Sequence, residues 1–184
     1  MKKGMVCALG LMVFGMMVLG TGPAWAMSGI GVGPITSWDQ TLTCTKIYCP
    51  RFVVLTNMGG QAVLDKETGL VWEQSPSTNG YNWNAAQVQC FMLTKGGRFG
   101  WRLPTIQELS SLMDPTRSNP ALPPGHPFSN VQNDLYWSAT SVDSDPAWAN
   151  LINMGDHTFG PQEKTHPDGG YKWCVRGGQG VDAQ

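Results

Sequence analysis

Polar side chains that could contact a ligand gather in stretches of the sequence without helical or strand periodicity. These stretches are residues 116–134, 141–146 and 155–168. The side chains concerned are Arg117, His126, Asp143, Asp145, Asp156, His157, Lys164 and His166. Charged and imidazole groups on loops can be presented to a partner at little cost to a fold. We therefore interpret these residues as candidate ligand-binding groups on long loops.

Asp143, Asp145 and Asp156 also support a metal-binding hypothesis. Calcium takes roughly six to eight oxygen ligands, which these carboxylates and nearby backbone carbonyls could only just supply. The alternative for Asp143 and Asp145, in "SVDSDPAW", is a solvated turn. Zinc is disfavoured because the histidines do not have the spacing of zinc ligands. We expect no cofactor, with calcium as the single candidate metal.

Several function classes are disfavoured by motif and charge. The sequence has neither a Gly-x-Ser-x-Gly elbow nor a His-Glu-x-x-His motif, which removes two common enzyme classes. The formal net charge is −1, and it becomes −3 once Lys2 and Lys3 are removed with a leader peptide. The remaining cations are scattered along the chain, so they do not form the basic patch that nucleic acid requires. A binding protein is favoured over an enzyme, and nucleic acid is excluded as a partner.

The N-terminal residues have the pattern of a secretory signal peptide. Lys2 and Lys3 precede an apolar run from residue 5 to about residue 20, and "AWA" at residues 24–26 fits a signal peptidase site. The alternative is a retained anchor, but glycines interrupt the run and it is shorter than the roughly 20 residues that span a bilayer. We predict a signal peptide at 1–26, a periplasmic or secreted protein, and no stable membrane span after cleavage. Residues 27–50 are glycine-rich at first and read as a flexible leader.

Cysteines are even in number after the predicted cleavage. Cys44, Cys49, Cys90 and Cys174 remain, and four thiols in an exported chain allow three disulfide pairings. The short separation of Cys44 and Cys49 favours a local bridge, which leaves Cys90 and Cys174 for a long-range one. Because each of these cysteines has an available partner, a catalytic thiol is disfavoured.

The stretch "GGRFGWRLPTIQELSSLMD" at residues 96–114 predicts a built corner followed by a short helix. Thr105 and Glu108 have the spacing of a capping box at the helix start. Arg102 lies beside Trp101 and could pair with a carboxylate such as Glu108 or Asp114. We assign the corner to architecture; the alternative makes the Arg102 guanidinium a fork for a sulfate or carboxylate ligand.

The remaining pattern predicts an α+β domain. Short β-branched and aromatic runs indicate strands, and the predicted strands are "RFVVL", "AVLD", "GLVWEQ", "LYWSAT", "AWANLIN" and "YKWCVRGG". A further helix is predicted after Asn82, with its buried stripe at Trp83, Ala86, Cys90 and Leu93 and its end at Gly96 and Gly97. Trp137, Trp148 and Trp173 on the later strands are interpreted as core, with a sugar-stacking platform as the alternative.

Six blocks in a fixed order carry a resemblance to a known family. They are "DKETGLVWEQ", the spacing Trp83–Ala86–Cys90, "GWRLPTIQELSSLMD", "YWSAT", "AW" and "CVRGG". In this order they resemble the DUF1566 family, also called the Lcl C-terminal domain family. The resemblance covers residues 52–178, so we place one domain at 51–178 and a C-terminal tail at 179–184.

This resemblance implies a C-type-lectin-like fold, with a small twisted antiparallel sheet, two short helices, long loops and a disulfide between the first helix and the last strand. That disulfide would be Cys90–Cys174. Members are mostly exported bacterial proteins, and some end collagen-like adhesins that bind sulfated glycans. No Gly-x-y repeat precedes the domain here, and the Glu-Pro-Asn, Gln-Pro-Asp and Trp-Asn-Asp triplets of calcium-dependent lectins are absent.

Together these observations predict an exported bacterial binding module that recognises a glycan or an envelope protein through its long loops. The alternative is an enzyme of unrecognised chemistry on the same scaffold, comparable to formylglycine-generating enzymes. Fold alone does not carry that activity across. The sequence leaves the oligomeric state open.

Overall fold

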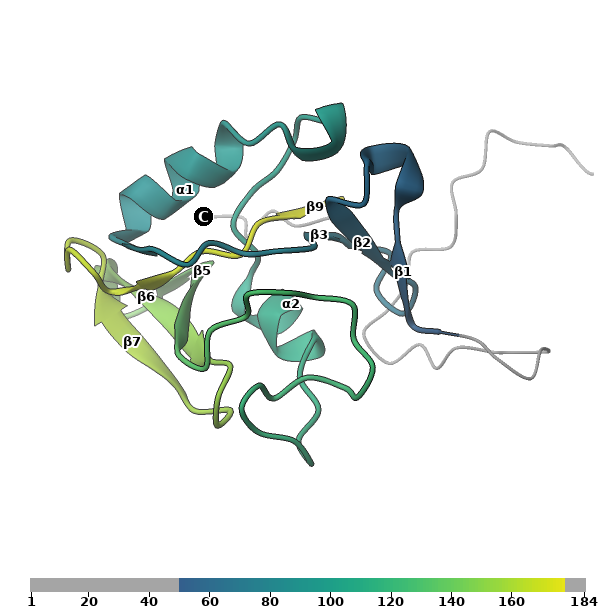
Figure 1. Cartoon of the computed structure of the whole chain (residues 1–184). Helices are drawn as coiled ribbons and strands as arrows, with labels where there is room; N and C mark the ends of the chain where they lie inside the picture. The colour runs from purple at the N-terminus through teal and green to yellow at the C-terminus, as the bar shows by residue number, and fades with distance from the viewer. Residues whose placement is uncertain (1–49, 178–184) are drawn as a thin grey trace, which may run out of the picture. The chain divides into compact units, whose positions relative to one another are not determined.

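The structure is a computed structural model, and it describes residues 50–177 (Figure 1). The predicted signal peptide, the leader before Pro50, the Cys44–Cys49 bridge and the tail at 179–184 lie outside the described residues. Within them the fold is mixed α+β, with two sheets, two α-helices and one disulfide bond. In the same range no helix has the length and hydrophobicity needed to cross a bilayer.

Sheet A is formed by short antiparallel strands from both ends of the described region. Its order is β1 (Phe52–Val54), β2 (Ala62–Asp65), β3 (Val71–Glu73) and β9 (Val175–Arg176). A 3-10 turn, η1 (Thr56–Met58), joins the first two strands. It ends at Gly59 and Gly60, whose φ angles of 62° and 72° lie in the left-handed region that glycine favours. The predicted strands "RFVVL" and "AVLD" thus contain β1 and β2, which pair as an antiparallel hairpin.

Sheet B contains the longest strands and one parallel contact. Its order is β4 (Gly80–Tyr81), β8 (Gly170–Tyr171), β5 (Leu135–Val142), β6 (Asp145–Asn153) and β7 (Phe159–Glu163). Strands β5, β6 and β7 form antiparallel hairpins, whereas β8 pairs with β5 in parallel.

The prediction of a single antiparallel sheet is therefore wrong. The stretch "YKWCVRGG" was expected to be one strand, but it divides into β8 in sheet B and β9 in sheet A. The reason lies in the buried residues between them. The indole Nε1 of Trp173 donates to the Glu73 carbonyl at 2.9 Å, and the Cys174 amide donates to the Glu73 carboxylate at 2.7 Å. These bonds direct the chain out of sheet B and onto β3.

Two capped helices cover different parts of the core. Helix α1 (Trp83–Phe91) begins at Asn82, whose side chain accepts from the Ala85 amide at 2.8 Å. Helix α2 (Ile106–Ser111) begins at the predicted capping box. In Figure 1, α1 runs along the upper side of the domain and α2 lies below β9. Residues of α1 belong to one buried cluster and those of α2 to another.

Helix α1 ends earlier than predicted. Its last residue is Phe91, and Gly96 and Gly97 instead belong to a separate 3-10 turn, η2 (Lys95–Gly97). Gly96 has a φ of 64°, and a Cβ placed on it would lie 2.5 Å from the Cβ of Met58. The glycine is thus needed for close packing of η2 on η1, and not for closing the helix.

Four tryptophans fill the core. Trp72, Trp101, Trp137 and Trp173 are at most 1% exposed, while Trp148 is half-buried. The interpretation of Trp137 and Trp173 as core residues is confirmed.

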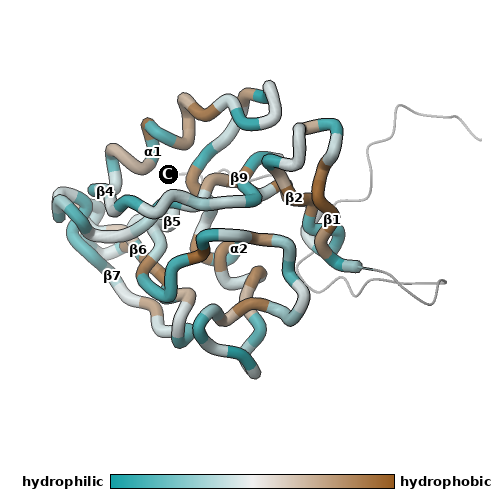
Figure 2. Tube along the Cα trace, viewed as in Figure 1, coloured by the Kyte–Doolittle hydropathy of each residue, from teal (hydrophilic) through white to brown (hydrophobic). Residues whose placement is uncertain are grey.

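The Pro-rich excursion at 116–134 is attached to the domain over much of its length. Ala121, Leu122 and Phe128 are buried in it, and the Ala121 amide donates to the Met154 carbonyl at 2.7 Å. Hydrophobic stretches accordingly recur along this part of the trace as well as along α1 (Figure 2).

Candidate functional site

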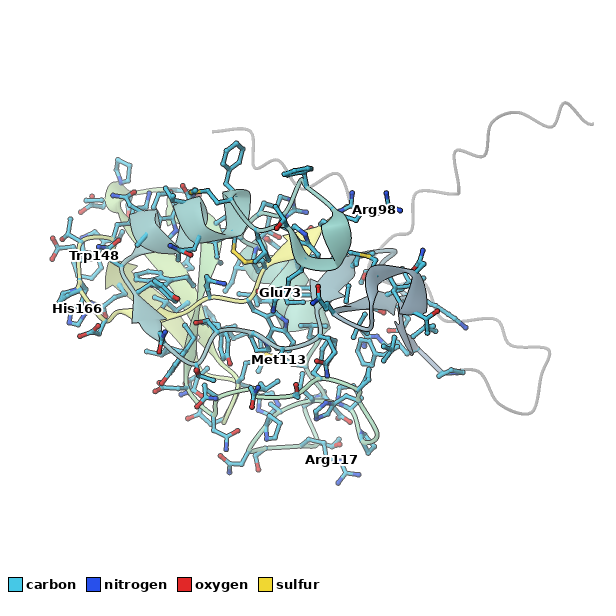
Figure 3. All side chains as sticks on the ribbon, turned by 45° about the horizontal axis from the view of Figure 1, so that its top comes forward. Glu73, Arg98, Met113, Arg117, Trp148 and His166 are labelled. Carbon is cyan, nitrogen blue, oxygen red and sulfur yellow. A yellow bond between two sulfur atoms is a disulfide. The ribbon has the colours of Figure 1, made fainter. Side chains whose placement is uncertain are left out.

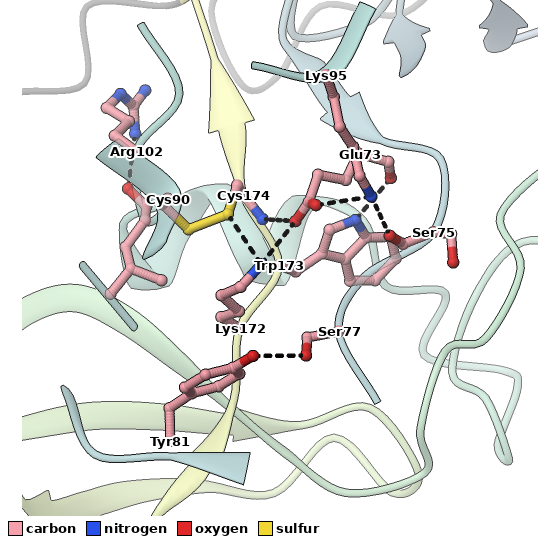
Figure 4. The surroundings of a disulfide bond; sticks show 11 residues. Glu73, Ser75, Ser77, Tyr81, Cys90, Lys95, Arg102, Lys172, Trp173 and Cys174 are labelled. Carbon is pink, nitrogen blue, oxygen red and sulfur yellow. Dashed lines mark hydrogen bonds and ion pairs between the residues drawn. A yellow bond between two sulfur atoms is a disulfide. The ribbon is translucent and has the colours of Figure 1, made fainter. Parts of the chain in front are cut away.

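A buried disulfide anchors the end of α1. The bond joins Cys90 to Cys174 across 84 positions of sequence, and neither residue is exposed (Figure 4). Cys90 faces inward on the stripe that the sequence predicted, and Cys174 immediately precedes β9. The predicted pairing is confirmed, and no cysteine within residues 50–177 is left as a free thiol.

A buried carboxylate beside the disulfide anchors the next segment. Glu73 is 1% exposed, and Lys95 Nζ lies 2.9 Å from its Oε1 while Lys172 Nζ lies 3.8 Å from its Oε2 (Figure 4). Lys95 also donates to the Ser75 carbonyl at 2.7 Å. Moving η2 away from β3 would leave the buried carboxylate of Glu73 without its partners, which costs free energy. The contacts therefore hold η2 against β3.

The cluster of Glu73, Lys95 and Lys172 was not predicted from the sequence. The available signal was the acidic residue at the end of "GLVWE", a run whose other members suit a buried strand. A charged residue at such a place indicates a buried partner, but the sequence does not show which lysine supplies it.

The Trp101–Leu103 corner is pinned by a forked ion pair. Both oxygens of Glu108 accept from the Arg102 guanidinium at 2.7 Å. Arg102 also donates to the carbonyls of Leu103 and Gly177 at 3.1 and 2.9 Å. Of the two carboxylates that the sequence suggested as partners, Glu108 forms the pair and Asp114 does not. Because these contacts use the guanidinium donors, Arg102 orders the corner.

The capping box on α2 completes this arrangement. Thr105 Oγ1 accepts from the Glu108 amide at 3.2 Å, and the Glu108 carboxylate accepts from the Thr105 amide at 2.8 Å. Glu108 therefore links the helix start to the corner, as the spacing predicted.

A groove of about 380 Å³ lies between α1 and this corner. Its lining is mostly apolar and consists of Gln87, Val88, Phe91, Trp101, Arg102, Leu103 and Ala139. The residues expected to be purely architectural thus form one wall of the groove. The other wall is the solvent-facing side of α1.

Large apolar side chains stand exposed on the α1 wall of the groove and on nearby residues of the chain. The exposed fractions are 79% for Phe91, 74% for Phe99, 69% for Met92 and 53% for Val88. Val88, Phe91 and Met92 have the i, i+3, i+4 spacing of one helix face, opposite to buried Ala86 and Cys90. We call residues 83–103 the α1 platform. Gathered apolar side chains on a protein surface indicate a site of interaction.

The α1 platform is also free of acidic residues. No Asp or Glu occurs between Glu73 and Glu108, whereas residues 109–168 contain seven. Lys95 and Arg102 are paired with the two flanking buried glutamates. Arg98 is exposed, and Arg176 reaches the platform by donating to the Phe99 carbonyl at 3.1 Å. Neither arginine has an ion-pair partner among residues 50–177.

Sequence reasoning missed the outer face of α1. The stripe Trp83, Ala86, Cys90 and Leu93 was assigned to the interior, and the apolar residues between its members were left out of account. The signal was present, because "WNAAQVQCFML" holds apolar residues on both faces and no charge. A helix of that composition on a surface indicates a second buried contact.

The loop residues do not converge on one site. Asp143 lies in the β5–β6 turn and Asp145 begins β6, whereas Asp156 and His157 lie beyond the other end of β6. A nine-residue strand separates the two groups, and such a strand is about 27 Å long. Within residues 50–177, no three His, Cys, Asp or Glu side chains group in a way that could hold a metal ion. The three aspartates proposed for calcium are thus not brought together.

Several loop side chains are engaged within the domain. His157 Nε2 lies 2.9 Å from the Asp114 carbonyl, and Asp156 accepts from the hydroxyl of Thr158 at 2.6 Å. The hydrogen bond from Thr158 lowers the pKa of Asp156 below its ordinary value.

Lys164 is engaged at the other end of β6. It donates to Ser141 Oγ at 2.6 Å, and its ammonium lies 4.0 Å from the ring centre of Trp83. Partial burial lowers the pKa of Lys164.

The remaining loop candidates are separate from these. Arg117 is exposed, and Figure 3 shows it far from His166. His126 is half-buried and stacks on Phe128 with ring centres 6.0 Å apart. Its Nδ1 is buried without a hydrogen-bond partner among the described residues, and burial lowers its pKa. These side chains are spread over the surface and do not define one pocket.

Comparison with protein families agrees with the order of sequence blocks. Residues 61–176 match the model of the Lcl C-terminal domain, which is the family also called DUF1566. No curated protein matches the chain. Because the matched residues are more than half of the sequence, the chain belongs to the Lcl C-terminal domain family.

Proposed function

We propose that this member of the Lcl C-terminal domain family is an exported binding module on a C-type-lectin-like scaffold. Its partner is a component of the cell envelope that presents apolar groups beside negative charge. The binding surface is the α1 platform. The observation that carries the proposal is the set of exposed Val88, Phe91, Met92 and Phe99 side chains on a segment without Asp or Glu, two of which, Val88 and Phe91, line the groove.

The platform is ordered before any partner arrives. The Cys90–Cys174 bond fixes the last turn of α1, the Lys95–Glu73 pair fixes η2, and the Arg102–Glu108 fork fixes the corner. A surface that is already ordered loses little conformational entropy on binding. Three anchors behind one apolar surface therefore support binding as its use.

The long loops give weaker support for a ligand site. Binding sites usually bring a few polar groups together in a concave surface. The polar loop residues are divided between the two ends of β6, and His157, Asp156 and Lys164 already have partners in the domain. A glycan bound only by these loops would contact single polar side chains that are too far apart to form one site.

The scaffold assignment and the choice against catalysis rest on the disulfide. A bond from the first helix to the residue preceding β9, with two short helices and antiparallel strands, supports a C-type-lectin-like scaffold. The same bond occupies both thiols that a formylglycine-generating type of chemistry would use. We therefore favour binding over catalysis on this scaffold.

Sedimentation with envelope fragments tests the proposal. The protein is recovered from the periplasm or medium of cells expressing the full chain, and its saturable binding to washed envelope fragments is measured. We expect the double variant Phe91→Ser, Phe99→Ser to lose at least about tenfold in affinity, since two exposed rings are removed.

Phe159→Ser is the matched control, because Phe159 is 75% exposed but lies on β7, away from the platform. It should bind like the unchanged protein. A chelator should leave binding unchanged, since no free carboxylate lies on the platform. Normal binding by the platform variant, with loss in Asp143→Ala, Asp145→Ala, would place the site on the loops instead.

A further inference from the structure

We infer that the α1 platform binds the surface of an anionic lipid bilayer, with Phe91, Met92 and Phe99 entering the interface and Arg98 and Arg176 contacting headgroups. This inference rests on the proposed function and names its partner. It uses exposed apolar side chains and two arginines that have no ion-pair partner among residues 50–177.

The first argument is the way the apolar side chains are displayed. Phe91, Phe99 and Met92 are each at least 69% exposed, so most of each side chain stands clear of the domain. A folded protein partner would need a pocket shaped to each of them. The interfacial region of a bilayer accepts protruding aromatic and aliphatic groups without a matching shape.

The second argument is charge. An anionic bilayer attracts cations and repels carboxylates within a short distance of its surface. Arg98 and Arg176 lie beside Phe99 without an ion-pair partner among residues 50–177. The acidic residues nearest in sequence to the platform, Glu73 and Glu108, are buried and neutralised by Lys95 and Arg102. The platform therefore meets the electrostatic requirement, whereas the acidic region 109–168 does not.

The third argument is the groove. It is open at the surface, and Val88, Phe91 and Leu103 give it apolar walls, with Arg102 at one side. An acyl chain displaced from the bilayer could lie along these walls while its headgroup remained near the arginines. The groove thus extends the apolar contact beyond the protruding rings.

A peptide that binds as an added strand is less well supported by the platform. Such a peptide pairs with a free strand edge. The platform consists of α1, η2 and the corner, and the corner backbone at Arg102 is already paired with Val175 at 2.9 Å in both directions. The platform therefore offers side chains and no backbone ladder.

Vesicle sedimentation tests the inference. Protein recovered from cells expressing the full chain is mixed with vesicles of phosphatidylcholine alone, or with vesicles in which part of the lipid is phosphatidylglycerol. We expect binding to the anionic vesicles that weakens with salt, and at least about tenfold weaker binding to the neutral ones. Phe91→Ser, Phe99→Ser should reduce binding about tenfold, while Phe159→Ser leaves it unchanged.

A matched pair of cation variants separates headgroup contact from bulk charge. Arg98→Gln, Arg176→Gln and Lys66→Gln, Arg117→Gln remove the same charge, but only the first pair lies at the platform. We expect only the first to lose the preference for phosphatidylglycerol. Circular dichroism checks that each variant is folded, and a Phe99→Trp variant, read by fluorescence, should shift to the blue on anionic vesicles.

The outcomes distinguish the two proposals. Platform-dependent binding to envelope fragments without binding to either vesicle would overturn the lipid inference and leave the proposed function, with a protein or glycan as partner. Vesicle binding that is equal in the platform and Phe159 variants would overturn the lipid inference, whereas equal binding of these variants to envelope fragments would overturn the assignment of the proposed function to the platform.

Discussion

The α1 platform and the long loops differ in what holds them and in what they expose. The platform is anchored by a disulfide and by ion pairs with two buried glutamates, and it exposes large apolar groups. Residues 109–168 contain seven acidic residues, and many of their polar groups bond to residues nearby in the chain. The acidic and other polar side chains therefore lie mostly in the loop region. The anchored backbone and the exposed apolar side chains of a preformed binding surface lie on the α1 platform.

This difference shows that chemical variety and site formation are separate properties. Aspartates and histidines attract notice in a sequence, but a site needs groups that converge. On the platform, apolar side chains lie close together because long-range contacts fix α1, η2 and the corner in place.

The largest expected effect comes from removing the strongest anchor of the platform. Cys90→Ala, Cys174→Ala should lower the free energy of unfolding by about 4 kcal/mol, because the bond closes a long loop in the unfolded chain. Urea denaturation of oxidised protein measures this. The loop double variant Asp143→Ala, Asp145→Ala should change the value by at most about 0.5 kcal/mol per site. Equal losses in the two variants would remove the contrast between the regions.

A second test compares two arginines. Arg102→Ala leaves Glu108, which is 4% exposed, without its forked partner, so we expect a loss of about 3 kcal/mol in unfolding free energy. Arg117→Ala removes an exposed loop arginine, and its effect should stay within about 0.5 kcal/mol. If the Arg102 variant is as stable as the Arg117 variant, the corner is not pinned by this pair.

The α2 cap should contribute a smaller amount. Thr105→Ala removes the acceptor for the Glu108 amide and should cost about 1 kcal/mol in unfolding free energy. Thr105→Ser keeps a hydroxyl acceptor and should recover most of the loss. A denaturation midpoint that is unchanged by the alanine would mean that the hydroxyl contributes no stability at this helix start.

The smallest expected effect concerns the loop side and pH. Burial lowers the pKa of His126, so the unfolded chain takes up a proton at a higher pH than the folded one. The contribution of His126 is therefore present above its ordinary pKa of about 6.5 and is lost as the pH falls below it. Thermal melting from pH 8 to pH 5 should show a smaller decline in His126→Asn than in the unchanged protein. Parallel curves would contradict a lowered pKa of His126 in the folded protein.

Local signals in the sequence predicted local structure well. The capping box of Thr105 and Glu108 and the Asn82 cap each depend on residues a few positions apart. Their physical cause is a hydrogen bond or a backbone angle within one turn, so the sequence contains the whole of it. The ordered blocks also identified the family, and the stripe on α1 identified Cys90 as buried.

Features that depend on distant partners were mostly missed, and the Cys90–Cys174 pairing is the exception. The division between β8 and β9 is set by bonds from Trp173 and Cys174 to Glu73, about a hundred positions away. The groove exists because α1 packs opposite the corner, and these segments are separated in sequence. Without knowledge of the groove, the sequence could not show that the proposed binding site lies on the platform and not on the loops. Only the apolar outer face of α1 could have been read in advance, from the absence of charge in that helix.

The position of β9 also determines when sheet A can be completed. Strand β3 has β2 on one side, and its other side stays open until Val175 and Arg176 pair with Val71 and Trp72. The corner at Arg102 also forms only after this segment is in place, because its backbone pairs with Val175. Contacts across such long separations form late and slowly. We therefore expect the nascent chain to remain open while it is being synthesised and to close only after residue 176 has emerged.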